Sequence, residues 1–241
     1  MTRSISPRRY DATERRRLAE QQRRDSRRRV VAAATQRFLQ AGYAATTIAD
    51  VARAAGVAVQ TVYSAVGGKA GLLIAVVNQA VAGDDRDVMF LEREWMTALR
   101  AEPDPHRQVR IFADTMTAIG ARVVPLYVMM RAAAAGDPDV AAAWQRSVDL
   151  RRESARAVVA ALRGRRPDVS QERAIDLVWM LASPEVYEML VLQRGWAPAE
   201  CADWVAGSIS AAVLDRPGQR QEPKPHRARA QPTGQEPNPT G

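Results

Sequence analysis

The strongest constraint on the fold comes from residues 47–66, where two short helical patterns are separated by a tight turn. Thr47 is suited to cap a helix, and Asp50 three residues later completes a capping-box pattern. Gly56 then readily takes the positive φ that ends a helix. Apolar residues at helical spacing fill both patterns: Ile48, Val51, Ala52 and Ala55 before the glycine, and Val57, Val62 and Val66 after it. We expect two short helices joined by a tight turn over residues 46–66.

Helical patterns also flank this segment on both sides. Val30, Ala34 and Phe38 recur at a spacing that places them on one face of a helix, which Gly42 is expected to end. Another helix is expected from Lys69 to about Ala82. Beyond it the pattern stays helical, with breaks at 103–105, 136–138, 164–167 and 195–198. Because Ala, Val and Leu dominate the apolar residues, we predict an all-α fold.

The residues that enzymes and metal sites need are scarce. Cys201 is the only cysteine, and the only histidines are His106 and His226. No metal-ligand set, glycine-rich phosphate loop or nucleophile elbow is present. We therefore expect no enzyme activity, no cofactor and no bound metal. A single cysteine fits the reducing cytoplasm, and no apolar stretch predicts a membrane span or a secretion signal.

The positive charge is concentrated at the two ends of the chain. The net charge is +8, and residues 1–30 carry 11 arginines against 4 acidic residues. Residues 1–22 lack an apolar stripe and the segment after residue 215 is rich in Pro, Gln and Gly, so both are expected to be disordered. We therefore divide the chain into a basic arm (1–22), a small helical domain (23–74), a larger helical domain (75–215) and a tail (216–241).

The second of the two short helices expected within residues 46–66 has an unusual exposed face. Gln60, Thr61, Tyr63 and Ser64 are uncharged but rich in hydrogen-bonding groups. Such a face suits the major groove of double-stranded DNA, where amides and hydroxyls read base edges. Arg24, Arg27 and Arg28, on or just before the first helix, are placed to meet the phosphate backbone or the minor groove. Each of these arginines is equally well explained as part of a solvated face.

The segment from Gly42 to Leu73 resembles the DNA-binding domain of the tetracycline-repressor family. The shared landmarks are Gly-Tyr, Thr-Thr-Ile, Ala-Ala-Gly-Val, Thr-Val-Tyr and Gly-Lys, in this order. The resemblance implies that Thr47 and Tyr63 contact bases or phosphates and that Lys69 contacts the DNA backbone. Three positions depart from the family pattern, where Ala58 replaces a capping Ser or Thr, Val66 an aromatic residue and Ala70 a Glu.

The resemblance also implies that the larger domain binds a small effector and forms a homodimer through its last two helices. The bulky residues of its middle section are the candidate effector contacts: Trp95, Phe112, Met116, Tyr127, Met130, Trp144 and Trp179. Their chemistry suggests an apolar or amphipathic effector. Two strongly apolar helices near the end supply the expected dimer interface: Leu177, Leu181, Leu190, Trp204, Ile209 and Val213. Both sets equally suit an ordinary intramolecular core.

The favoured function is a transcriptional regulator that binds a palindromic operator as a homodimer and responds to a small molecule, with repression as the default. Two alternatives remain open. One is a nonspecific, nucleoid-type protein that binds DNA through its basic arms. The other is a regulator whose body has a filled core and no effector.

Overall fold

The computed structural model describes residues 7–83 and 89–215, and the regular structure of these residues is helical. The all-α prediction is confirmed. In chain order the helices are α1 (Pro7–Ala45), α2 (Ile48–Ala55), α3 (Val59–Val66), α4 (Lys69–Ala82), the short 3₁₀ turn η1 (Phe90–Glu92), α5 (Glu94–Ala101), α6 (Pro105–Ala133), α7 (Pro138–Ala161), α8 (Gln171–Leu181), α9 (Pro184–Tyr187), the π-helical segment η2 (Glu188–Gln193) and α10 (Pro198–Val213).

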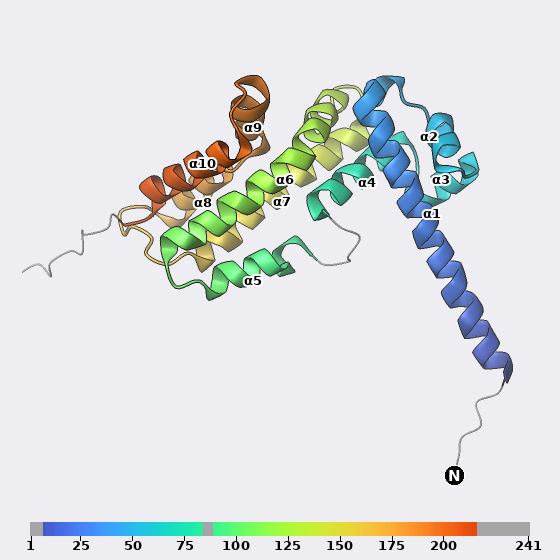
Figure 1. Ribbon diagram of the computed structural model, residues 1–241, viewed down its shortest axis with the longest axis horizontal. Coiled ribbons are helices and arrows are strands. Elements are labelled where there is room, and N and C mark those ends of the chain that lie inside the picture. Colours follow the sequence, from blue (N-terminus) through green and yellow to red (C-terminus); the bar gives the residue numbers. More distant parts are fainter. Residues whose placement is uncertain (1–6, 84–88, 216–241) are drawn as a thin grey trace, which may run out of the picture.

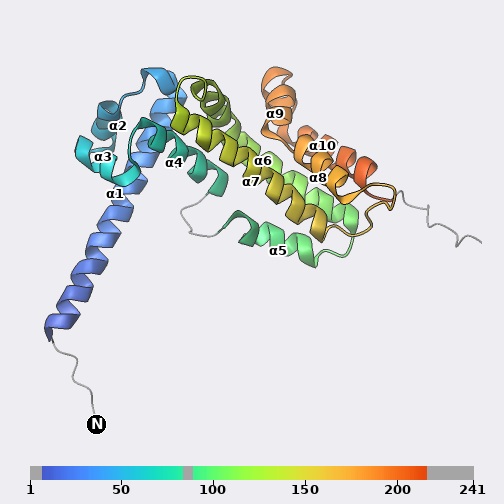
Figure 2. The same cartoon turned by 180° about the vertical axis from the view of Figure 1, so that it is seen from behind.

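Helices α1 to α4 form a small unit, here called the head, and α5 to α10 form the larger body (Figure 1). Seen from behind, the head lies at one end of the body, and α4 leads from the head toward α6 and α7 (Figure 2). The long helix α6 contacts α4, α5, α7, α9 and α10. The body is therefore a bundle built around one central helix.

The N-terminal half of α1 differs from the expectation. Residues 7–22, expected above to be a disordered arm, continue α1 as helix and project away from the body (Figure 1). Arg, Glu, Gln, Ala and Leu make up most of this segment, and all are good helix formers. An ion pair of 2.6 Å between Arg24 and Glu20 joins it to the following turn. Residues 1–6 of the arm and the tail 216–241 lie outside the described residues.

The ends of the head helices follow the sequence closely. Gly42, with φ of 79° and ψ of 169°, interrupts α1 as expected. The Thr47 hydroxyl accepts a hydrogen bond of 3.1 Å from the Asp50 amide, and the Asp50 carboxylate accepts one of 3.3 Å from the Thr47 amide. This confirms the capping box of α2. Gly56 ends that helix at φ of 64°, in the left-handed region. Ala58 begins α3 with no side-chain cap.

Two buried clusters stabilise the fold, and one of them joins the head to the body. Phe38 of α1, Val62 of α3 and Leu72 of α4 lie in the same cluster as Met130 of α6 and Val140 of α7. The second cluster lies inside the body, among α5, α6, α7, α8 and α10. Helix α4 runs without interruption through the boundary expected between residues 74 and 75. The head therefore shares a core with the body and does not hang on a linker.

Among the described helices, α6 is long and apolar enough to cross a membrane by length and composition alone. This finding goes against the expectation that no apolar stretch of that length exists. Within its most apolar window, 44% is buried inside the molecule. A core helix passes the same test, and α6 occupies the centre of the bundle.

The core that joins the head to the body predicts a large difference between two neighbouring substitutions. Phe38 is 0% exposed and Leu39 is 55% exposed. Phe38→Ala leaves a cavity beside α4 and is expected to lower the free energy of unfolding by about 3–5 kcal/mol. Leu39→Ala, the matched control, is expected to change it by less than about 0.5 kcal/mol. Denaturant unfolding measures both, and equal effects would contradict the packing described here.

The missing cap of α3 predicts a stabilising substitution. Ala58 has the extended backbone of a capping residue, with φ of −69° and ψ of 150°. Ala58→Ser supplies a hydroxyl for the free amides of α3 and is expected to raise the free energy of unfolding by about 1 kcal/mol. The control is Ala54→Ser, an exposed position inside α2, where serine is expected to bring no gain. Thermal unfolding compares the two, and a loss of stability on Ala58→Ser would refute this account of the helix start.

Candidate functional site

Helix α3 presents the polar face that its sequence predicts. Val62 is buried and fixes the helix against α1 and α2, so the opposite face is exposed. Gln60, Tyr63 and Ser64 are exposed, with Tyr63 48% exposed, and Thr61 is half-buried. The Ser64 hydroxyl donates a hydrogen bond of 3.1 Å to the Thr61 carbonyl. Because their side chains are exposed, the amide of Gln60 and the phenol of Tyr63 are available to a partner at the surface.

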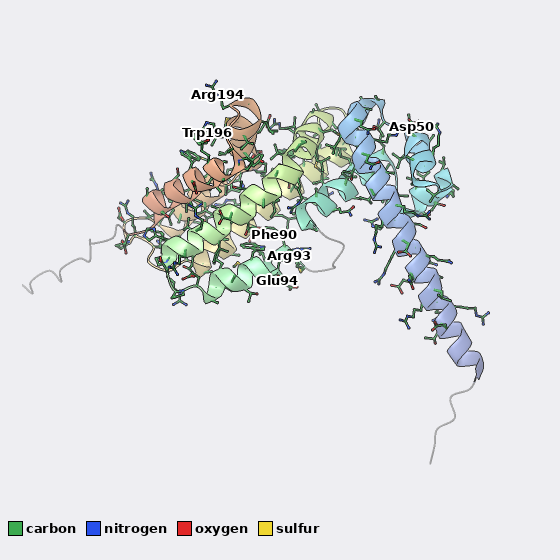
Figure 3. All side chains as sticks on the ribbon, viewed as in Figure 1. Asp50, Phe90, Arg93, Glu94, Arg194 and Trp196 are labelled. Carbon is green, nitrogen blue, oxygen red and sulfur yellow. The ribbon has the colours of Figure 1, made fainter. Side chains whose placement is uncertain are left out.

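Thr47, exposed at the start of α2, is already used within the head. Its hydroxyl donates a hydrogen bond of 2.6 Å to the Asp50 carboxylate. The side chain and then the backbone of Thr47 hold the pKa of Asp50 below its ordinary value, so that carboxylate stays ionised near neutral pH. Figure 3 shows Asp50 on the head and Arg194 and Trp196 on the body. The helix start that carries Thr47 is fixed before any partner binds.

The three arginines expected to face DNA are exposed on α1, and each has a local contact. Arg27 donates a hydrogen bond of 2.5 Å to the Ala65 carbonyl and so fixes the end of α3 against α1. Arg24 pairs with Glu20 at 2.6 Å and Arg28 lies 3.7 Å from Asp25. Exposed pairs of this kind are weak, so they leave Arg24 and Arg28 able to change partner. Arg27 instead supports the helix that carries the polar face.

Lys69 begins α4, and its ammonium group also has contacts within the head. The Lys69 amine donates a hydrogen bond of 3.0 Å to the Ala44 carbonyl and lies 4.6 Å from the ring centre of Tyr43. This arrangement holds the turn after Gly42 against the start of α4. That Lys69 also contacts a DNA backbone stays a prediction.

Two residues that position the head were not singled out from the sequence. Thr46 is 2% exposed, and its hydroxyl donates to the Gly42 carbonyl at 2.8 Å. At Gly71 an added Cβ would lie 1.9 Å from the Val66 carbonyl oxygen, so only glycine allows this approach of α4 to α3. Sequence patterns give no sign of either contact, because each contact spans an interruption of the helical pattern. Thr46 and Gly42 meet at the kink of α1, and Gly71 and Val66 meet across the turn between α3 and α4.

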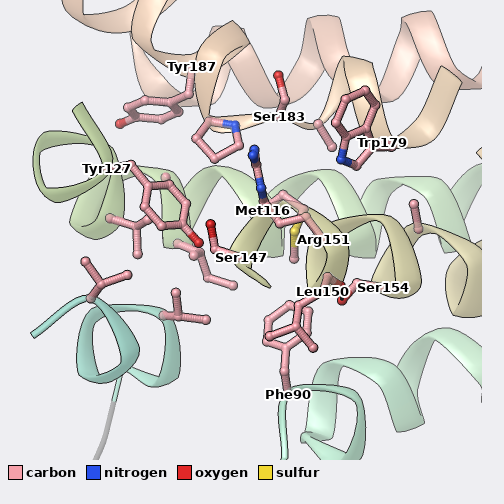
Figure 4. A pocket seen from close by; sticks show the side chains of 18 of the residues that line it. Phe90, Met116, Tyr127, Ser147, Leu150, Arg151, Ser154, Trp179, Ser183 and Tyr187 are labelled. Atoms are coloured by element: carbon pink, nitrogen blue, oxygen red, sulfur yellow. Dashed lines mark hydrogen bonds between the residues drawn. The ribbon is translucent and has the colours of Figure 1, made fainter. Parts of the chain in front are cut away.

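A cavity of about 530 Å³ lies inside the body, between α4, η1, α6, α7, α8 and α9 (Figure 4). Five of the seven residues expected to contact an effector line it: Phe112, Met116, Tyr127, Met130 and Trp179. The other two expected contacts do not line it and lie behind its wall. The Trp95 ring is 6.3 Å from that of Phe112, and the Trp144 ring is 5.6 Å from that of Tyr127. These two tryptophans support lining residues, which sequence alone does not distinguish from contacts.

The cavity also contains a charged residue that the sequence did not indicate. Arg151 of α7 lines it, and its guanidinium group donates a hydrogen bond of 2.9 Å to Glu185. The same group lies 5.6 Å from the ring centres of both Tyr127 and Trp144. Burial raises the pKa of Glu185, but the hydrogen bond and charge of Arg151 outweigh it and leave the pKa below its ordinary value. In the sequence, Arg151 belongs to a charged run typical of a solvated face.

The residues expected at a dimer interface divide into three groups. Trp204 of α10 is 40% exposed and packs edge-on against Trp196. Leu177, Leu181 and Leu190 are half-buried. Ile209 and Val213 are 1% and 0% exposed in the core of the body, so the expectation that they contact a partner is wrong. The apolar pattern of α10 covers two faces, and these two residues lie on the inner one.

No group of three or more His, Cys, Asp or Glu side chains that could hold a metal ion occurs within residues 7–83 and 89–215. Cys201 is buried in the body, and burial raises the pKa of its thiol. His106 is exposed, and His226 lies outside the described residues.

Comparison with known proteins agrees with this architecture. Residues 30–76 match the model of the bacterial regulatory proteins of the tetR family. No curated protein matches the chain by sequence. Three similar solved structures are a proposed TetR-family transcriptional regulator from Rhodococcus sp. (14% identity, TM-score 0.59, 79% of this chain and 98% of that one), a transcriptional regulator from Rhodococcus sp. Rha1 (16%, 0.56, 77% and 95%) and a proposed TetR-family transcriptional regulator from Mesorhizobium loti (20%, 0.51, 77% and 94%).

The family match covers α2, α3 and most of the buried residues that fix them, including Phe38 and Val62. The structural likeness extends over both head and body at low sequence identity, and so it concerns the fold. Members of this family are transcriptional regulators and not enzymes. Residues 30–76 are therefore similar to the DNA-binding domain of the tetR family of bacterial regulatory proteins, and the chain shares its fold with solved structures of TetR-family regulators.

Proposed function

We propose that the chain is a ligand-responsive repressor that binds a near-palindromic operator as a homodimer in the cytoplasm. The observation that carries this proposal is the uncharged, hydrogen-bonding face of α3. The head that carries α3 shares a buried core with the body, and the body contains a cavity. In functional terms we assign residues 23–74 to DNA binding and residues 75–215 to effector binding and dimerisation.

The polar face of α3 supports reading of the major groove. Gln60 pairs well with adenine, and the hydroxyl groups of Thr61, Tyr63 and Ser64 suit bases or phosphates. The arginines of α1 add attraction for the phosphate backbone. In a dimer, two such helices about 34–36 Å apart, or somewhat further, would meet successive turns of one DNA face, which explains a near-palindromic site.

Exposed apolar side chains support a dimer through the last helices of the body. Met180 at the end of α8, Leu192 of η2 and Trp204 of α10 are 48%, 52% and 40% exposed. Apolar groups of this size gain stability when a second copy covers them. Two helices from each subunit would form a four-helix interface.

The cavity supports control by a small molecule. Its volume of about 530 Å³ is within the range of ligand pockets. A ligand there would contact α7, which also holds the head, and so would change the spacing of the two α3 helices. We take repression as the default, because a dimer bound at an operator blocks the polymerase. The cavity favours this proposal over an effector-independent regulator with a filled core.

The DNA-binding proposal predicts that the face of α3 determines sequence selectivity. Gln60→Ala and Tyr63→Ala are each expected to weaken binding to the DNA upstream of the gene by about 1–3 kcal/mol at 150 mM salt. Gln145→Ala, an exposed glutamine of the body helix α7, is the control and should leave affinity unchanged. Fluorescence anisotropy with upstream and scrambled duplexes provides the measurement.

Deletion of residues 1–22 separates this proposal from the nonspecific alternative. The shortened chain should bind its operator more weakly but still prefer it over scrambled DNA, because phosphate contacts carry no sequence information. If the deletion removes nearly all binding and the α3 substitutions have no effect, the protein is a nonspecific DNA-binding protein.

The dimer proposal predicts that a charge at Trp204 separates the subunits. Trp204→Glu is expected to raise the dissociation constant of the dimer by about 30-fold or more, since buried aromatic anchors contribute about 2 kcal/mol or more. Leu39→Glu places the same charge at an exposed leucine of the head and should not affect the dimer. Sedimentation velocity measures the assembly, with circular dichroism as a check of folding. An unchanged dimer would show that subunits meet elsewhere.

A further inference from the structure

We propose that the N-terminal half of α1 is a second DNA-binding element, which holds the phosphate backbone beside the base pairs that α3 contacts and enters neither groove. Its partner is double-stranded DNA, contacted through one arginine-rich side of the helix. This inference rests on the proposed DNA-binding function and deepens it, because it names further contact residues and the part of the DNA that they meet.

The arginines of this segment are gathered on one side of the helix. Residues 13–29 are helical and carry eight arginines and three acidic residues. Because an α-helix turns by about 100° per residue, six of these arginines fall within a sector of about 140° that contains one acidic residue, Glu20. This arginine sector consists of Arg16, Arg17, Arg23, Arg24, Arg27 and Arg28.

The remaining circumference of the same segment is electrically balanced. Its charged residues are two arginines and two acidic residues: Arg15, Arg29, Glu14 and Asp25. The charged side chains of both sides are exposed. A helix face that serves only solubility needs no such separation of charge, whereas a polyanion binds the side on which positive charge is concentrated.

The arginine sector lies on the side of α1 against which α3 packs. Arg27 belongs to the sector and donates a hydrogen bond of 2.5 Å to the Ala65 carbonyl of α3. Val30 and Ala34 follow on the same side of α1 and are buried in one cluster with Val62 of α3. Toward its N-terminus α1 then projects beyond α3 and away from the body (Figure 1). The sector therefore continues the surface that α3 begins.

The depth of the major groove brings its phosphates within reach of this sector. A helix in the groove lies about 8.5 Å deep, so the phosphates at the groove edges stand level with the helices behind it. Helix α1 is such a helix, because α3 packs against it. Arg16 lies about 16 Å from Arg27 along the axis, which is the length of about five base pairs. The sector can thus follow the backbone beyond the bases that α3 contacts.

The helical form of this segment excludes the minor groove. An α-helix with its side chains is about 10–12 Å across, whereas the minor groove is about 6 Å wide. An extended arm fits that groove, but residues 13–29 are helix. Phosphate oxygens are therefore the groups that the arginines can reach, and guanidinium groups bind them well.

Two double variants that remove the same charge from the same helix test the inference. Arg16→Gln with Arg23→Gln removes two charges from the arginine sector. Arg15→Gln with Arg29→Gln, the matched control, removes two charges from the balanced side. Glutamine is a good helix former, so both variants should keep α1 helical, and circular dichroism checks this.

Fluorescence anisotropy of the full chain on upstream and scrambled duplexes, between about 50 and 200 mM salt, is the measurement. We expect the sector variant to weaken binding to both duplexes about tenfold or more, because phosphate contacts carry no sequence information. The slope of log affinity against log salt should fall by about 0.9 for each lost contact, or about 3.6 for the four contacts of a dimer. The control variant should stay within about twofold of the unchanged chain.

A second arm of the experiment replaces A·T by G·C pairs beside the bases that α3 contacts. Affinity should stay within about twofold, because the minor groove is where these pairs would be distinguished by a bound arm. Equal effects of the two double variants would overturn the inference, since net charge alone would then explain them. A strong loss on the A·T to G·C change would also overturn it, because the segment would then read the minor groove.

Failure of the proposed function would look different. If the sector variant weakens binding to both duplexes while Gln60→Ala and Tyr63→Ala change nothing, the phosphate-binding helix stands and the selective regulator is wrong. If Gln60→Ala weakens binding to the upstream DNA while the two double variants behave alike, the regulator stands and the second DNA-binding element is wrong.

Discussion

The packing of α4 between the head and the body is the constraint on which the rest of the structure depends. Leu72 and Leu73 of this helix are buried, as are Val76 and Val77 one turn later. On one side α4 contacts α1, and on the other it contacts α6 and α7. Without these contacts α2 and α3 would pack only against α1 and each other, and isolated helices of eight residues are unstable. The orientation of α3 therefore depends on contacts that α4 makes with the body.

Local signals predicted the head well, because its helix ends are encoded by single residues. Thr47 caps α2, Gly56 ends it, and the lack of a capping side chain at Ala58 could be read directly. The N-terminal arm differs from its prediction because the absence of an apolar stripe does not by itself imply disorder. Residues 7–22 have no core to join, but their high helix propensity and their position ahead of a packed helix extend α1. An apolar periodicity shows which face of a helix is buried. A segment without that periodicity still forms a helix when it continues from a stable one, as residues 7–22 do.

The body was predicted less completely, because its site depends on which face of each helix turns inward. Bulky residues marked most of the cavity wall, yet composition does not separate a lining residue from one behind it, as Trp144 shows. The positions of arginine side chains, at the surface or in the cavity, are harder still to predict from sequence. Arg152 contacts both Glu172 and Asp176, at 3.0 and 2.9 Å, and joins α7 to α8, whereas Arg151 one position earlier points into the cavity. Neighbours on a helix differ by about 100° in direction, so the same residue type serves surface and interior.

The hydrogen bond of 3.0 Å from the Tyr43 phenol to Asp137 links α1 of the head to the start of α7 in the body. Asp137 caps α7, and Arg151 lies about 21 Å further along the same helix. Burial and the hydrogen bond to Asp137 raise the pKa of Tyr43 to about 12, so the phenol remains a donor throughout the physiological range. Because a helix is stiff over this length, a movement of α7 at the cavity would reach the head both at this phenol and through the buried residues that the head shares with the body. The response proposed above would therefore depend on the packing of α7 as well as on its cap.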